Sequence, residues 1–466
     1  MSHTTFAENK PSMTPSDLLQ KYNIPVPRYT SYPTVPIWQE GINVAEWKNV
    51  FQHDFEEGNS TRGISLYIHL PFCESLCTYC GCNKRITTNH KVEGEYIDAV
   101  LKEWTIYQSL MSERPVIREL HLGGGTPTFF SAESLARLLM GILNSATIHP
   151  EHEFSFEGHP NNTTELQMQV LYDLGFRRVS FGVQDNDPEV QRIINRIQPF
   201  ENVQKATETA RRIGYKSVNF DLIYGLPLQT KESIQRTIEQ TISLRPDRVA
   251  FYSYAHVPWT SRGQRLFDEN DLPSTNNKIE LYRTGKEMFV ACGYKDIGMD
   301  HFAMPEDDLN TASEKGTLHR NFMGYTTLNS SMLLGLGVSS ISSTDHAFAQ
   351  NDKTLNGYYD SINNGELPIQ KGYFMSEEDK RFGRYILDIS CRGTTAFLSE
   401  DMETISQYCL PELQKLIPDN LITINNNIVT VTDLGWSFIR NICSCFDLYL
   451  IKSKVNKEQK MFSNAI

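Results

Sequence analysis

The stretch that decides the fold is "ISLYIHLPFCESLCTYCGC", residues 64–82. It begins with an apolar run of β-branched and aromatic residues, which predicts a buried strand. It ends with four of the nine cysteines of the chain, which fall within ten residues. Thiols crowded at the exit of a strand can close disulfides, hold a zinc ion, or hold a group that needs one ligand position left open.

The composition is that of a globular protein in a reducing compartment. The 466 residues are 39% hydrophobic and 21% charged, and no apolar run has the length of a membrane span. The start, "MSHTTFAENKPSMTPS" (1–16), is polar and lacks the apolar segment of a secretion signal. We therefore expect a cytoplasmic protein, in which disulfides are disfavoured. The net charge of −12 argues against nucleic acid as the main partner.

Short apolar runs alternate with longer amphipathic stretches in the first half of the chain. Six runs predict strands, at 64–70, 118–125, 153–158, 177–184, 217–225 and 247–255. Helical periodicity lies between them, as in residues 93–110 and 132–143. Repeats of strand and helix imply a parallel sheet with right-handed crossovers. The predicted fold class is α/β, an open or partial (β/α)6 barrel.

Four regions follow from changes of pattern along the chain. Residues 1–57 form an N-terminal arm with few periodic elements, rich in Pro and aromatic residues. Residues 58–292 form the barrel and end in a helix at 275–292, and residues 293–365 extend the barrel on the substrate side. Residues 366–466 predict a small α+β domain like a winged helix, with a hairpin at 421–432 and a helix at 433–450.

The spacing of the cysteines favours an iron–sulfur cluster. Cys73, Cys77 and Cys80 form C-x3-C-x2-C, and Cys82 extends the motif. Structural zinc sites usually take two pairs of ligands from separate segments, and no second C-x2-C pair is obvious. Three thiolates on one loop suit a [4Fe–4S] cluster with one iron left open for a small molecule. Zinc and a redox thiol are the alternatives.

Polar and glycine residues lie where several of the predicted strands end. They are His69, Gly123 to Gly125, Glu157, Gln184, Asp221 and Ala255. In barrel enzymes the carboxyl ends of the strands carry the chemistry. We therefore expect these residues to gather at one rim. The bland alternatives are a tight turn for the glycines, a solvated charge for Glu157 and a core position for Ala255.

The cysteine motif at the end of the first strand resembles that of the radical S-adenosylmethionine (SAM) superfamily. A narrower resemblance, to the oxygen-independent coproporphyrinogen III oxidase family, covers residues 27–447 in order. It rests on "PRYTSYPT", "CGCNK", "GGGTPT", "GVQD", "NFDLIYGLP", "YAHVP", "GMDHFA", "LHRNF", "GYTT" and "RNICSCFD". The resemblance implies a radical SAM barrel that works in anaerobic haem biosynthesis. Two propionates of coproporphyrinogen III would lose CO2 and become vinyl groups, giving protoporphyrinogen IX, methionine and 5′-deoxyadenosine.

The resemblance also implies roles for particular residues. Cys73, Cys77 and Cys80 would bind the [4Fe–4S] cluster, and Cys82 would not. Catalytic positions would be Tyr67, His69 and Glu157, and two SAM molecules would bind side by side. Their contacts would be Tyr67, Tyr79, Gly124, Gly125, Thr126, Glu157, Gln184, Arg196, Asp221, Ala255 and Ile341. As isolated residues, Ala255 and Ile341 are typical of the core, and only the resemblance promotes them.

Two positions depart from the family pattern. Met323 stands where relatives commonly have Gln, so a polar contact there is lost. "GHPNN" (158–162) follows Glu157, where relatives often carry an acidic residue before the proline. Both departures concern contacts to substrate or cosubstrate and leave the cluster ligands intact.

The remaining expectations concern partners and rival functions. We expect a low-potential electron donor such as flavodoxin or ferredoxin, a monomeric chain, no nucleic acid and no membrane span. The arm, with Arg28, Tyr29 and Tyr32, is expected to close over the tetrapyrrole; the alternative is that it only packs on the barrel. Rival functions are a haem-modifying radical SAM paralogue and a non-catalytic haem carrier. DNA binding through the C-terminal domain is disfavoured because that region is not notably basic.

Overall fold

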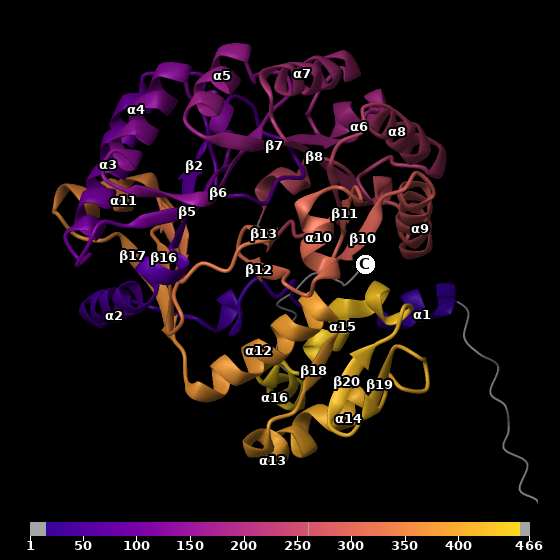
Figure 1. Cartoon of the computed structure of the whole chain (residues 1–466). Coiled ribbons are helices and arrows are strands. Elements are labelled where there is room, and N and C mark those ends of the chain that lie inside the picture. Colours follow the sequence, from indigo (N-terminus) through magenta and orange to yellow (C-terminus); the bar gives the residue numbers. More distant parts are fainter. Residues whose placement is uncertain (1–14, 260, 457–466) are drawn as a thin grey trace, which may run out of the picture.

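A thirteen-stranded sheet forms most of the molecule (Figure 1). The structure, a computed structural model, describes residues 15–259 and 261–456. The chain start and the last ten residues therefore lie outside the described residues. The strand order is β1-β17-β16-β15-β14-β2-β5-β6-β7-β8-β9-β11-β10, and β1 and β10 at its two ends do not pair with each other. Within the described chain the sheet is thus open, as predicted.

Six consecutive parallel strands build the centre of this sheet. They are β2 (Ile64–Leu70), β5 (Val116–Gly124), β6 (Thr147–Gly158), β7 (Phe176–Gln184), β8 (Ser217–Tyr224) and β9 (Arg248–Ser253). The predicted strands are confirmed, although β6 starts six residues early. That extension, Thr147–His152, is exposed or half-buried throughout and so carries no apolar signal. In β2 six of seven residues are buried, because parallel strands are covered on both faces.

Helices cover the outer face of these strands (Figure 1). They are α3 (Val92–Gln108), α4 (Ala132–Leu143), α5 (Glu165–Asp173), α7 (Phe200–Ile213), α8 (Lys231–Ser243) and α9 (Thr275–Ala291). Short elements lie between them, namely β3 (Phe72–Cys73), β4 (Arg85–Ile86) and α6 (Pro188–Ile193). Leu135, Leu138, Leu139 and Ile142 place one apolar stripe of α4 in the main core. The helices predicted at 93–110, 132–143 and 275–292 are confirmed.

Residues beyond the six units extend the sheet on both sides. On one side lie β14 (Met332–Leu336), β15 (Ile341–Ser343), β16 (Ala347–Asn351), β17 (Ile369–Phe374) and β1 (Gln39–Glu40). On the other side lie β11 (His301–Ala303) and β10 (Lys295–Gly298). Two helices, α10 (Asp308–Glu314) and α11 (Leu355–Asn363), and the hairpin of β12 (His319–Asn321) and β13 (Gly324–Thr326) complete the extension. The range assigned to the C-terminal domain begins before β17, which in fact pairs with β16.

The N-terminal arm is more regular than its composition indicates. After α1 (Pro15–Tyr22) comes α2 (Val44–Arg62), a helix of 19 residues. Asn43 caps it by accepting from the backbone N–H groups of Ala45 and Glu46, and Trp47, Phe51 and Phe55 enter the main core. The expectation of few periodic elements was wrong here, and the boundary expected at residue 57 falls inside this helix.

The C-terminal unit has its own core. It contains α12 (Glu377–Arg392), the sheet of β18 (Thr394–Ala396), β20 (Ile428–Val431) and β19 (Ile422–Asn425), the short helices α13 (Met402–Thr404) and α14 (Leu410–Leu413), and α15 (Ile439–Ser444) and α16 (Leu448–Asn456). The helix predicted at 433–450 is broken, because the Asp447 carboxylate accepts from the Leu450 N–H and starts α16 anew. The arm joins this core through Leu18, Leu19 and Tyr22.

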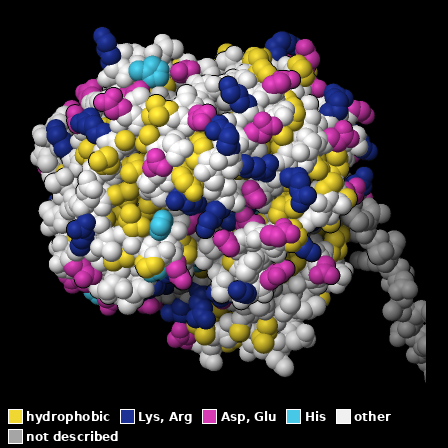
Figure 2. All heavy atoms as spheres, turned by 45° about the horizontal axis from the view of Figure 1, so that its top comes forward, with side chains coloured by type: hydrophobic (Ala, Val, Ile, Leu, Met, Phe, Trp, Pro, Cys, Tyr) yellow, Lys and Arg dark blue, Asp and Glu magenta, His cyan; other side chains and the backbone are white. Residues whose placement is uncertain are grey.

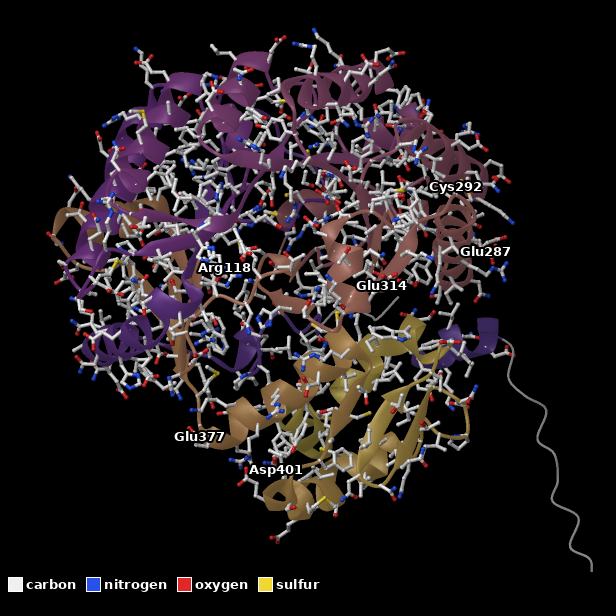
Figure 3. All side chains as sticks on the ribbon, in the orientation of Figure 1. Arg118, Glu287, Cys292, Glu314, Glu377 and Asp401 are labelled. Carbon is white, nitrogen blue, oxygen red and sulfur yellow. The ribbon has the colours of Figure 1, made fainter. Side chains whose placement is uncertain are left out.

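No helix among the described residues has the length and hydropathy needed to cross a bilayer. On the face in Figure 2, Lys and Arg side chains are interspersed with Asp and Glu. Figure 3 shows Cys292 near α9 at the outside of the molecule, and this cysteine is exposed.

Candidate active site

The cysteine motif leaves the sheet at the carboxyl end of β2 and returns beside it. The Arg85 N–H donates to the Pro71 carbonyl at 2.7 Å, and the Thr87 N–H donates to the Cys73 carbonyl at 2.9 Å. These bonds close the segment from Cys73 to Lys84 into a loop at its base. Lys84 Nζ donates to the Cys80 carbonyl at 2.9 Å, which holds the far side of the loop.

The three predicted cluster thiols lie on one loop and line one cavity. Three thiolates presented together by a single loop suit a polynuclear iron–sulfur cluster, which cysteine thiolates hold. The one described group of three potential metal ligands whose ligand atoms all lie within 4.8 Å of one another is elsewhere, at His53, Asp54 and His346.

The surroundings of the motif separate Cys80 from Cys82. A hydrogen bond from Cys82 and the nearby Lys84 charge together lower the pKa of Cys80 to about 6. The same pairing raises the pKa of Cys82 well above its usual range. Arg196 Nη1 donates to Cys77 Sγ at 3.7 Å, and Cys73 Sγ lies 3.3 Å from the Thr126 hydroxyl. The motif therefore favours a thiolate at Cys80 and a thiol at Cys82.

A cavity of about 460 Å³ opens over the motif at the carboxyl ends of the strands. Most of the site residues expected from the sequence line it. They are Cys73, Cys77, Cys80, Tyr79, Gly124, Gly125, Thr126, Glu157, Gln184, Arg196 and Asp221. The parallel register explains this gathering, because successive strands place their last residues at one edge.

Backbone approaches tightly at the glycine run. A Cβ at Gly125 would lie 2.5 Å from the Pro71 carbonyl oxygen, so no other residue fits without a shift of backbone. Gly124 has φ +119°, which favours glycine, and its N–H donates to Glu157 Oε2 at 3.3 Å. The run therefore brings main chain beside the cysteine loop and orients the Glu157 carboxylate.

Asp221 and Arg196 supply a carboxylate and a guanidinium to the lining of the cavity. Burial raises the pKa of Asp221 to about 6, although the Ser180 hydroxyl donates to its carboxylate at 2.7 Å and Asn219 Nδ2 at 3.0 Å. Arg196 Nη2 donates to the Gly182 carbonyl at 2.5 Å, while its buried Nε has no hydrogen-bond partner among the described residues. One carboxylate and one guanidinium thus face a pocket suited to a zwitterionic ligand.

Four expected residues lie outside the described lining of the cavity. The Tyr67 hydroxyl lies 3.1 Å from His69 Nδ1, and His69 Nε2 lies 2.9 Å from the Asn83 carbonyl, so this pair supports the loop from behind. Gln264 Nε2 donates to the carbonyls of Ala255 and Tyr79, at 3.1 and 2.9 Å. Ile341 sits in β15, beside Gln350.

The cavity also contains residues that the sequence did not assign. They include His159, Asn161, Asn162 and Tyr252. Burial and the Arg196 charge lower the pKa of His159 to about 3, so the imidazole is neutral near pH 7. The unusual "GHPNN" stretch was the available signal for three of them. Met323 lies at the tip of the β12–β13 hairpin, and its N–H donates to the Asn321 side chain at 2.8 Å.

Comparison with known proteins identifies the class of this site. The radical SAM superfamily matches residues 67–241, which include the cysteine loop and four of the central strands. The chain is 39% identical to an oxygen-independent coproporphyrinogen III oxidase of Pseudomonas aeruginosa, covering 93% of this chain and 96% of that one. It is 37% identical to the enzyme of the same name from Escherichia coli, covering 96% and 98%.

A solved structure agrees with these relatives. Coproporphyrinogen III oxidase from Escherichia coli, described as a radical SAM enzyme, superposes with a TM-score of 0.85 at 36% identity, over 91% of this chain and 98% of that one. The chain is thus a radical SAM protein. It belongs to the oxygen-independent coproporphyrinogen III oxidase family, and the fold and enzyme class expected from the sequence are confirmed.

Proposed function

We propose that this chain carries out the oxidative decarboxylation of coproporphyrinogen III to protoporphyrinogen IX in anaerobic haem biosynthesis. Two propionates each lose one hydrogen atom, one CO2 and one electron, and each becomes a vinyl group. The observation that carries the proposal is the cavity in which the three thiols meet Glu157, Arg196 and Asp221. When bound, the cluster supplies the electron that cleaves SAM reductively, and the carbon radical so formed takes the hydrogen atom.

The residues around the cavity suit two neighbouring SAM molecules. On the side of the cysteine loop, Glu157 and the Gly124 backbone are placed to receive the molecule on the open iron. Gln184, Arg196 and Asp221 would bind a second molecule, whose carboxylate would pair with the guanidinium. Tyr79, Gly125 and Thr126 line the same cavity and would contact the two molecules. The Tyr67–His69 pair and the Gln264 bonds to Ala255 and Tyr79 act as positioning contacts.

The arm is proposed to act as a lid that keeps water from the reacting propionate. The Arg28 guanidinium lies 5.3 Å from the centre of the Tyr252 ring, which lines the cavity, and 3.3 Å from the Asp300 carboxylate. The Tyr29 hydroxyl donates to Asp447 at 3.1 Å, and the Leu448 N–H donates to the Tyr32 hydroxyl at 3.1 Å. The arm thus links the mouth of the site to the C-terminal unit.

Further proposals concern the setting of the reaction. We propose a low-potential flavodoxin or ferredoxin as electron donor, and a monomeric chain in the cytoplasm. A haem carrier on this scaffold is the rival function, but a carrier has no use for three cluster thiols beside an acidic and a basic wall.

An anaerobic assay tests the proposal. The reconstituted protein is supplied with SAM, a reductant and coproporphyrinogen III, and the porphyrinogens are oxidised and separated. We expect protoporphyrin, CO2, and 5′-deoxyadenosine at two per product. Cleavage of SAM without any loss of propionate would favour a paralogue with another substrate, and no cleavage at all would favour a carrier.

A further inference from the structure

Arg320, in β12, is a buried cation that has no carboxylate partner within the described part of the chain. Only 8% of the residue is exposed. Its Nε and Nη1 atoms are closed off from solvent and make no hydrogen bond among the described residues. Nη2 makes one long bond, at 3.4 Å, to the Arg28 carbonyl, and the guanidinium lies 4.7 Å from the centre of the Tyr325 ring. A buried charge left in this state is costly unless a ligand compensates it.

The other charged groups around Arg320 already have partners. Arg320 lines a cavity of about 420 Å³. In its lining, Lys380 pairs with Glu377, Arg384 lies 3.7 Å from Asp388, and Asp345 lies 2.7 Å from Arg62. The Asp379 carboxylate accepts from Ser376 and Tyr373. Among the described residues that line this cavity, Arg320 is therefore the cation without an anionic partner, while the Asp379 charge is held by hydroxyl and N–H donors.

Flat apolar groups form much of the wall of this cavity. Tyr29 and Tyr32 come from the arm, Phe322 from the β12–β13 hairpin and Phe348 from β16. An apolar wall with one unpaired guanidinium fits a ligand that has a ring system and a carboxylate.

The cavity adjoins the reaction site through one residue of the arm. The Arg28 carbonyl covers Arg320, while the Arg28 side chain lies over Tyr252 in the lining of the cysteine cavity. A shift of the arm would thus release Arg320 Nη2 from the Arg28 carbonyl and move the Arg28 cation away from Tyr252 at the same time. Arg28 itself is partly neutralised by Asp300 at 3.3 Å, so Arg320 is the stronger candidate to hold an incoming anion.

We propose that Arg320 binds a propionate of the tetrapyrrole in a subsite beside the reacting end, and that this binding displaces the Arg28 carbonyl. The inference rests on the proposed function, because it takes a propionate-bearing tetrapyrrole as the ligand. The guanidinium gives two N–H groups to the carboxylate, and Tyr29, Tyr32 and Phe348 contact the ring edge. Arg320 is then a specificity residue that selects carboxylate side chains.

Porphyrin binding tests the subsite without turnover. Coproporphyrin III and its tetramethyl ester are titrated into cluster-loaded protein by fluorescence quenching. The wild type should bind the acid more tightly than the ester. Arg320→Gln should raise the dissociation constant of the acid about 10- to 100-fold and leave that of the ester nearly unchanged, since one charge-assisted contact is lost. Arg212→Gln, at an exposed ion pair with Glu165, is the control and should change neither.

Two results would overturn the inference. Equal dissociation constants of the acid and the ester for the wild type would mean that no buried cation binds the carboxylates. A parallel weakening of acid and ester in Arg320→Gln means that Arg320 only supports the wall. If that variant does not fold, Arg320→Lys keeps the charge over Tyr325 and loses the two-pronged contact, and it should still weaken the acid alone.

Turnover separates this inference from the proposed function. In Arg320→Gln we expect the KM for coproporphyrinogen III to rise about 10-fold or more, with SAM cleavage in the absence of substrate unchanged. Wild-type turnover with an unaltered KM in the variant would sink the subsite and leave the proposed function standing. Selective binding of the acid by a wild-type protein that shows no turnover would support the subsite and contradict the proposed function.

Discussion

Single residues decide what the cysteine loop can hold. A fourth thiolate on the cluster would occupy the iron position that SAM needs, and the raised pKa of Cys82 opposes such ligation. We expect Cys80→Ala to abolish the cluster absorbance after anaerobic reconstitution. Cys82→Ser should retain a four-iron cluster by iron analysis and electron paramagnetic resonance. A three-iron or empty site in Cys82→Ser would contradict this assignment.

Asp221 gives a second test at the same scale. Because burial raises its pKa to about 6, the carboxylate is ionised at pH 7.5 and becomes neutral as the pH falls through 6. Binding of the second, cationic SAM should therefore weaken below pH 6. Asp221→Asn should weaken that site about 10- to 100-fold and remove this pH dependence, with the site on iron unaffected. Equilibrium dialysis measures SAM binding at both sites. One SAM bound per wild-type chain would contradict the proposal of two SAM sites.

Most residues of the site were predictable from the sequence where they lie on the predicted strands, and less so where they lie elsewhere. Glu157 and Gln184 were found because each lies at the end of an apolar run, and parallel strands bring such positions to one rim. Asp221 was found as the charged residue inside the run of β8. Arg196 lies beyond a strand, and only family resemblance indicated it. The unpaired state of Arg320 depends on groups from the arm and from α12, which no local pattern brings together.

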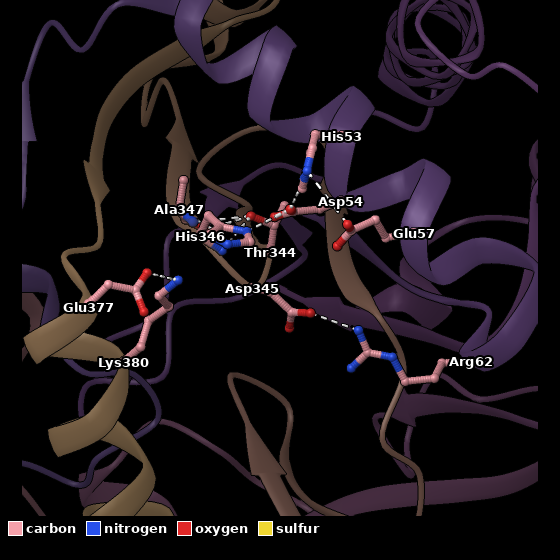
Figure 4. A network of polar contacts seen from close by, with 10 residues as sticks. All are labelled: His53, Asp54, Glu57, Arg62, Thr344, Asp345, His346, Ala347, Glu377 and Lys380. Atoms are coloured by element: carbon pink, nitrogen blue, oxygen red, sulfur yellow. Dashed lines mark hydrogen bonds and ion pairs between the residues drawn. The ribbon is translucent and has the colours of Figure 1, made fainter.

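At the scale of elements, a buried carboxylate ties α2 to the turn between β15 and β16 (Figure 4). Asp54 Oδ1 lies 3.1 Å from His53 Nδ1 and 2.6 Å from His346 Nδ1, and the Asp54 side chain is 1% exposed. Burial raises the pKa of Asp54, but hydrogen bonds from Thr344, His53 and His346 outweigh it, and the pKa is lowered. This carboxylate therefore stabilises the fold while it is ionised.

We expect Asp54→Asn to lower the free energy of unfolding by about 1–3 kcal/mol at pH 7. Since the folded pKa lies below the unfolded value, the wild type loses this advantage as the pH falls below about 4, and the two proteins converge. Urea unfolding at several pH values measures it. Asp345→Asn, in the exposed pair with Arg62, is the control and should cost roughly 0–1 kcal/mol. A constant difference across pH would rule out the ionic tie.

Helices and strands were predictable where their apolar residues follow one clear pattern along the sequence. The strands from β2 to β9 were found because full burial makes them continuous apolar runs. In α2 the spacing of Trp47, Phe51 and Phe55 was a usable signal, obscured by the proline-rich segment before it. The break before α16 depends on the Asp447 side chain, whose capping role is visible only once the backbone turns.

At the scale of the whole molecule, the two ends of the chain share one core. Leu18, Leu19 and Tyr22 pack with residues of the C-terminal unit, and Asn441 Nδ2 donates to the Tyr22 carbonyl at 2.9 Å. Deletion of residues 1–34 should therefore do more than open the lid. Hydrogen exchange should rise in α12, α15 and α16 and stay unchanged in β2 to β9, and the cluster should still form. A control that lacks residues 1–14 keeps these contacts and should match the wild type.

Equal exchange in the C-terminal unit after that deletion would mean that the arm only lies on the surface. Conversion of coproporphyrinogen III at the wild-type rate by the same protein would dismiss the arm as a lid.

The shared core has a consequence for the order in which a ribosome delivers this chain. The arm emerges first, yet the groups that hold it are among the last to be synthesised. Arg440 is one of them, and its Nη2 donates to the Val26 carbonyl at 2.5 Å. The central sheet and its cysteine loop can thus be complete while the arm is still loose. The arm can bind in its final position only after the C-terminal unit has been translated. An interrupted product would therefore contain the cysteine loop and the central sheet without the arm that shields the radical.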